Sequence, residues 1–218
     1  MKSSKSLTVF MALAMALALL TGAVAAPILC RPFYYAHIGP LNLEERTGLT
    51  EEEIKTAYDE MLDYCLGGEE FSTGVLKWSE SGKSHFTDVR FLFQLDLNVL
   101  ACTAGLLAAM ALVIFRNRHR PAPLLGRGPA FWAGVGLGAV FLVVAALAAL
   151  DFDRAFVIFH GIFFPGKDNW IFDWRTDPII LFLPEEFFRS CAILILALLL
   201  FWCAALIGAD LWADRGRR

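Results

Sequence analysis

Two of the four histidines in the sequence stand where they could do acid–base chemistry. His85 opens "HFTDV", just ahead of a long apolar run, and Asp88 follows it three residues later. Because side chains three apart share one face of a helix, the Asp88 carboxylate could hold one ring nitrogen of His85 and raise the basicity of the other. Alternatively, both side chains only begin a helix at a membrane surface. His160, in "FVIFHGIFFPG", is either a second catalytic group or a buried histidine bonded to a backbone carbonyl.

Other kinds of site have weaker support in the sequence. A metal site could be built from His85, Asp88, His160 and either Asp173 or Asp177, which are suitable nitrogen and oxygen ligands. However, the chain has no H-x-x-x-H or C-x-x-C pair. It also lacks the G-x-S-x-G elbow of a serine nucleophile and a glycine-rich phosphate cradle. We therefore predict neither a metal nor a cofactor.

The composition indicates that a membrane holds these residues in place. Of the 218 residues, 57% are hydrophobic and 13% aromatic, which is typical of membrane proteins. Four apolar runs are long enough to cross a bilayer. They cover residues 7–29, 91–115, 129–150 and 187–209. We predict an all-α integral membrane protein with four transmembrane helices, forming a single membrane domain over residues 1–218.

The first apolar run has a second interpretation. It follows "MKSSK" and ends in "AVAAP", as a secretory signal peptide would. Its length favours a retained helix. The net charge of −3, without a long basic block, predicts no nucleic-acid partner.

Lysine and arginine residues predict the orientation in the membrane. They precede the first run and recur in the loop 116–128 and in the C-terminal tail, so we expect both termini and this loop to be cytoplasmic. By contrast, residues 44–88 hold twelve acidic against four basic side chains. The segments 30–90 and 151–186 are then expected at the outer face, and they carry both candidate histidines.

The two outer segments differ in character. Thr50 and Glu53 form a capping-box pattern that predicts an amphipathic helix over Glu51–Leu66. Residues 151–186 are too interrupted by Gly and Pro to cross the membrane and too aromatic for a solvated loop, so we expect them at the headgroup boundary. Cys30 and Cys65 would both lie on the oxidising side, where they could pair or stay free.

Three motifs, in order along the chain, resemble the lipoprotein intramolecular transacylase (Lit) family. They are "HFTDV", "FHGIFFPGKDNWIFD" and "DPIILFLPEEFF", and "YDEMLDYCLGG" in the amphipathic helix adds to them. The resemblance implies acyl transfer within a diacylglyceryl-cysteine lipoprotein. The acyl chain would move from the sn-2 glycerol oxygen to the α-amine of the N-terminal cysteine and leave the lyso-form. Lys167 and Asp168 depart from the pattern by making the loop before Trp170 more charged.

The resemblance also implies roles for individual residues. His85 and His160 match the catalytic histidines of the family, with His85 as base and His160 as acid or oxyanion partner, or the reverse. Tyr64 or backbone amides could stabilise the oxyanion. Asp88, Trp170 and Asp173 are further candidates for supporting or substrate-binding contacts. A shared site requires the two histidines to lie within about 10 Å of each other, so that direct hydrogen bonds or a short water bridge can join the reacting groups.

The expected partners are diacylglyceryl-modified lipoproteins and membrane lipid, with the protein acting as a monomer. Two alternatives remain from the sequence. One is a metal-dependent hydrolase of membrane lipid at the outer face. The other is a non-enzymatic adaptor that uses the aromatic segment to hold lipid or a partner helix, in which case neither histidine would matter.

Overall fold

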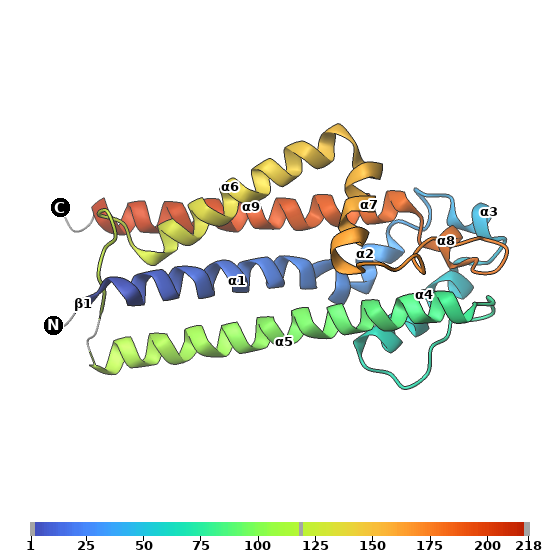
Figure 1. The fold of residues 1–218 in the computed structure, drawn as a ribbon, viewed down its shortest axis with the longest axis horizontal. Coiled ribbons are helices and arrows are strands. Elements are labelled where there is room, and N and C mark those ends of the chain that lie inside the picture. The colour runs from blue at the N-terminus through green and yellow to red at the C-terminus, as the bar shows by residue number, and fades with distance from the viewer. Residues whose placement is uncertain (1–2, 118–119, 216–218) are drawn as a thin grey trace. The chain divides into compact units, whose positions relative to one another are not determined.

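Long helices dominate the computed structural model, which describes residues 3–117 and 120–215 (Figure 1). Four of the helices are long and apolar enough to cross a membrane, and each contains one of the predicted runs. They are α1 (Lys5–Leu29), α5 (Glu80–Asn117), α6 (Pro129–Leu150) and α9 (Glu185–Arg215). The predicted all-α membrane fold with four transmembrane helices is thereby confirmed. Residues 118 and 119 of the predicted basic loop lie outside the described residues.

The chain divides into two compact units. One, which we call the span unit, consists of Met1–Val24, Leu97–Leu147 and Ile195–Arg218. The other, the site unit, consists of Ala25–Asp96 and Ala148–Leu194 and holds all the candidate catalytic residues. The single membrane domain expected from the sequence stays a prediction.

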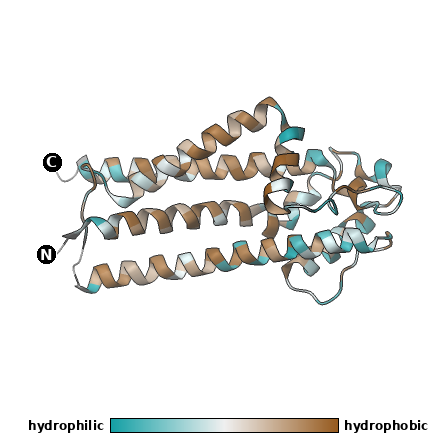
Figure 2. Ribbon diagram, viewed as in Figure 1, coloured by the Kyte–Doolittle hydropathy of each residue, from teal (hydrophilic) through white to brown (hydrophobic). Residues whose placement is uncertain are grey.

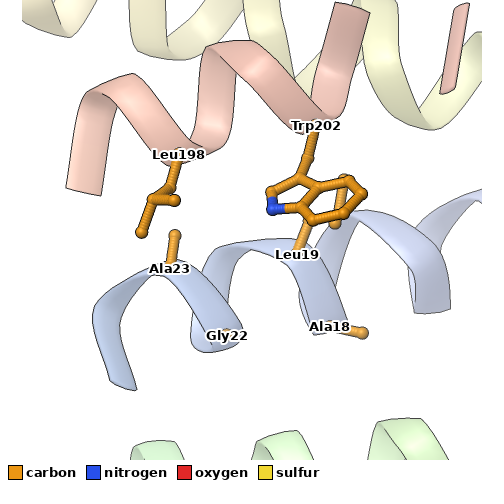
Figure 3. Close-up of a pocket in the computed structure, with 6 residues that line it drawn as sticks. All are labelled: Ala18, Leu19, Gly22, Ala23, Leu198 and Trp202. Atoms are coloured by element: carbon orange, nitrogen blue, oxygen red, sulfur yellow. The ribbon is translucent and has the colours of Figure 1, made fainter. Parts of the chain in front are cut away.

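Within the span unit, helices approach closely where small residues allow it. A Cβ atom on Gly134 of α6 would lie 2.7 Å from the backbone oxygen of Cys203 on α9, so only glycine fits there. A small cavity of about 170 Å³ lies between α1 and α9, lined by Gly22, Leu198, Trp202 and their neighbours (Figure 3). Two-residue strands, β1 (Ser3–Ser4) and β2 (Arg120–Pro121), pair in parallel near the start of α1.

The site unit contains the shorter helices. These are α2 (Arg31–Tyr35), α3 (Leu43–Thr47), α4 (Glu51–Leu66), α7 (Phe152–Phe163) and α8 (Ile179–Phe182). Helix α4 has the predicted bounds. It begins where the Thr50 side chain accepts from the Glu53 amide while the Glu53 side chain accepts from the Thr50 amide, and it ends at the C-cap Gly67, whose φ is 128°. Its buried Tyr58 stacks on Tyr34 with the ring centroids 3.7 Å apart.

Helix α5 is longer than a membrane span requires. Its 38 residues extend about 57 Å, against roughly 30 Å of bilayer hydrocarbon. Polar residues gather in its first turns, residues 80–90, which precede the apolar run 91–115 (Figure 2). The buried Asp177 carboxylate holds the start of this helix, accepting from the Ser79 amide at 2.7 Å and its hydroxyl at 2.8 Å. The loop that follows α7 is thus attached to the polar end of α5.

The cysteines are all free in the structure. Cys65 is buried in α4 and Cys30 is exposed at the end of α1. The sequence left open whether Cys30 and Cys65 form a disulfide, and in the structure both are free thiols.

Candidate active site

His85 lies in the polar first turns of α5 and is enclosed by aromatic rings. Its side chain is only 6% exposed. The rings of Phe164 and Phe172 meet it edge-on, with centroids 4.9 and 5.5 Å away. Its Nδ1 atom is buried and has no hydrogen-bond partner among the described residues. A buried polar atom without a partner is uncommon in folded proteins, so the environment of Nδ1 needs an explanation.

His160 lies near the end of α7, which begins where the Asp151 side chain caps the Arg154 amide. Its Nδ1 atom lies 2.8 Å from the Phe156 carbonyl oxygen one turn earlier. A carbonyl oxygen can only accept, so Nδ1 carries the proton and Nε2 keeps its lone pair. The Trp170 indole stacks on the imidazole with the centroids 4.3 Å apart. The His160 ring is therefore held in one orientation by a carbonyl and an indole.

The two imidazoles lie close together. Their ring centroids are 6.0 Å apart and their planes meet at 30°. This separation lies inside the limit of about 10 Å required for a shared site. The fold thus brings together two histidines that lie 75 residues apart in sequence.

Burial keeps both imidazoles neutral at ordinary pH. It lowers the pKa of His85 to about 4, and the neighbouring His160 adds to this effect. Burial also lowers the pKa of His160, against the opposing effect of the Phe156 carbonyl. A neutral imidazole accepts a proton, so the pair can serve two proton-transfer steps.

Asp88 does not contact His85 in the way the sequence suggested. Its carboxylate accepts from Lys167 Nζ at 2.6 Å and from Asn169 Nδ2 at 3.1 Å, both in the loop after α7. No hydrogen bond joins Asp88 to His85 in the described chain, although the Asp88 charge raises the pKa of His85 and so opposes the effect of burial. The carboxylate therefore binds the loop and makes no direct hydrogen bond to the imidazole.

Two other candidates bond residues other than the two histidines. The Tyr64 hydroxyl is 2.9 Å from the Thr87 hydroxyl, and its ring packs on Phe71. Asp173 is exposed and accepts from the Arg175 amide at 2.9 Å, which shapes a turn. Tyr64 thus supports α5 and Asp173 supports the loop.

The metal ligand set considered from the sequence is not assembled. Among residues 3–117 and 120–215, no group of three or more His, Cys, Asp or Glu side chains is placed to hold a metal ion. Asp173 and Asp177 bind the turn and the start of α5, as described above.

Comparison with known proteins agrees with this architecture. The family model of the lipoprotein intramolecular transacylase Lit matches residues 9–188, most of the chain. The chain belongs to the Lit family. Among solved structures, the membrane-integral Lit of Bacillus cereus superposes with a TM-score of 0.84 at 26% identity, over 97% of this chain and 95% of that one.

Two further structures of Bacillus cereus Lit also match, and in each a histidine of that protein has been replaced. The arginine variant gives a TM-score of 0.77 at 24% identity, covering 97% of this chain and 93% of that one. The alanine variant gives a TM-score of 0.76 at 25% identity, covering 95% of this chain and 93% of that one. No curated protein sequence gives a significant match.

Sequence reasoning overlooked the part that Asn169 and its neighbours play in this Lit chain. Asn169 bonds Asp88 beside His85, and Phe164 and Phe172 enclose the imidazole. The unusual charge of Lys167 was a usable signal, since a charged side chain in an aromatic segment calls for a partner of opposite charge. Which acid it would meet depends on how the loop folds over α5.

Proposed function

We propose that this member of the Lit family transfers an acyl chain within lipoproteins, from the sn-2 glycerol ester to the α-amine of the N-terminal diacylglyceryl-cysteine. The product is the lyso-form. The single observation that carries the proposal is the pair of buried, neutral imidazoles with centroids 6.0 Å apart. Family membership supplies the substrate class and the acyl-transfer activity.

The proton balance of the reaction calls for two bases. The α-amine has a pKa of about 8, so it reaches the site mostly as an ammonium ion. It loses one proton before attack and a second when the tetrahedral intermediate collapses to the amide. One of these protons goes to the departing glycerol alkoxide, and the other leaves to solvent.

In our assignment, His160 takes the first proton at Nε2 and later delivers it to the alkoxide. His85 takes the second proton from the attacking nitrogen. The proposal rests on the proton at His160 Nδ1, which leaves Nε2 free to accept. Both imidazoles begin neutral, as this order of proton transfers requires.

The ring that closes during attack has eight members, from the nitrogen through the thioether and glycerol carbons to the ester carbonyl. Such a reaction depends on holding one conformer of the substrate more than on activating the nucleophile. The rings of Phe164, Phe172 and Trp170 surround the histidines and form rigid walls suited to holding one conformer. Because these walls are apolar, they also exclude water that would otherwise hydrolyse the ester. Ester to amide is downhill, so the proposed reaction uses neither a metal nor a cofactor.

The protein is a membrane acyltransferase, and we propose that its site opens at the outer face with both termini cytoplasmic. The charge distribution supports this orientation, with twelve acids against four bases over residues 44–88 and basic residues in the loop 116–128. The lipid-bearing cysteine of an exported lipoprotein lies at the same face. We expect the enzyme to act as a monomer.

The test compares histidine variants in cells or liposomes that hold a diacylglyceryl lipoprotein. His85→Ala and His160→Ala should each abolish the N-acyl lyso-form, read by mass spectrometry of the N-terminal lipopeptide. His37→Ala is the matched control, because His37 also bonds a backbone carbonyl, that of Phe33 at 2.7 Å, while its ring packs on Phe33 and Phe187. Unchanged product in both site variants would refute the proposal.

A further inference from the structure

Two buried polar atoms in the site have no hydrogen-bond partner among the described residues. They are Nδ1 of His85 and Oδ1 of Asn169. His85 is 6% exposed, so water has little access to its ring. Leaving such atoms unpaired destabilises a folded protein. Two complementary unpaired atoms on neighbouring side chains suggest that they serve each other.

The direction of the Asn169 amide follows from its neighbour. Its Nδ2 group donates to Asp88 Oδ2 at 3.1 Å, and a carboxylate can only accept. The NH2 end must therefore point to Asp88, and the oxygen end points elsewhere. Asp88 is itself held by Lys167 Nζ at 2.6 Å. The carboxylate thus sets the orientation of the amide through Oδ2, while Lys167 bonds the other oxygen, Oδ1.

We propose that Asn169 is a positioning residue for His85, whose amide oxygen accepts the Nδ1 proton and leaves Nε2 as the proton-accepting atom. The role resembles that of the third group which orients the base in many nucleophilic enzymes. Asp88 then acts on the imidazole through Asn169. The catalytic role of Asn169 rests on the proposed function. The tautomer of His85 does not depend on that function.

The two side chains are close enough to interact. The Asn169 side chain raises the pKa of His85, against the larger effect of burial.

A simpler role must be separated from this one. Asn169 could only attach the loop after α7 to α5, and the pair Lys167–Asp88 does the same. Lys167→Met removes that ion pair and leaves the Asn169 amide in place, so it is the matched control. Asn98→Ala, at an exposed position of α5, controls for loss of an amide elsewhere.

The experiment combines imidazole 15N NMR with kinetics on the full protein in lipid nanodiscs. We expect wild-type His85 to show a protonated Nδ1 and an unprotonated Nε2, assigned with His85→Gln. In Asn169→Ala the two tautomers should mix, and kcat should fall roughly 10- to 100-fold with little change in KM. Lys167→Met and Asn98→Ala should keep the wild-type tautomer and lose no more than about threefold in kcat.

Two outcomes would overturn the inference. One is an unchanged His85 tautomer in Asn169→Ala. The other is an equal loss of kcat in Asn169→Ala and Lys167→Met, which would assign Asn169 to loop attachment. If wild-type His85 shows the expected tautomer while no acyl chain reaches the amine, the proposed function fails and the positioning role stands. Melting temperatures of all variants identify any that have lost the fold.

Discussion

Acidification from pH 7 to pH 5 should destabilise the protein measurably through His85. Burial lowers the pKa of this residue from 6.5 to about 4, so the folded state resists its protonation while the unfolded state does not. The stability contributed by neutral His85 is complete above pH 6.5 and is lost as the pH falls towards 4. Linkage puts the loss at pH 5 at about 2 kcal/mol. For a chain of this size that is a fall in melting temperature of roughly 4–8 °C.

The measurement is the melting temperature in one detergent at pH 7 and pH 5, for wild type and for His85→Gln. The variant cannot titrate at this position, so the difference between the two pH shifts isolates His85. His160 contributes in the same direction, because burial also lowers its pKa, but it is present in both proteins. Equal pH shifts in wild type and variant would refute the reasoning, as would a His85 that protonates above pH 6 by NMR.

Two further variants test the packing around the site and between the spans. Trp170→Leu removes the ring stacked on His160, and we expect product formation to fall about tenfold, since the imidazole loses one of the groups that orient it; unchanged turnover would remove Trp170 from the site. Gly134→Ala places a methyl group 2.7 Å from the Cys203 backbone oxygen and should cost about 1–3 kcal/mol of stability in a thermal melt. Gly136→Ala, which meets nothing within 4 Å, should cost little, and equal losses would contradict the proposed close approach.

Local patterns predicted much of the architecture. The apolar runs predicted four spanning helices because length and composition alone decide whether a helix can cross a bilayer. The start of α4 was correct because a capping box is a contact between residues three apart in sequence. The sequence left the role of Asp88 open, and neither alternative named its partners, Lys167 and Asn169. Neighbours on one helix compete with side chains from elsewhere, and Lys167 and Asn169 arrive from a loop that follows α7.

The sequence by itself determined the membrane class, the spanning helices, the amphipathic helix α4 and, through motif order, the family. These features depend on local periodicity and on residues at fixed spacing. Only the tertiary structure decided that the His85 and His160 rings lie 6.0 Å apart, that Asp88 binds the loop, and that Asn169 lies beside His85. The reason is physical: the path of the loop between α7 and α9 depends on contacts such as Asp177 with Ser79, 98 residues apart, which local patterns do not encode.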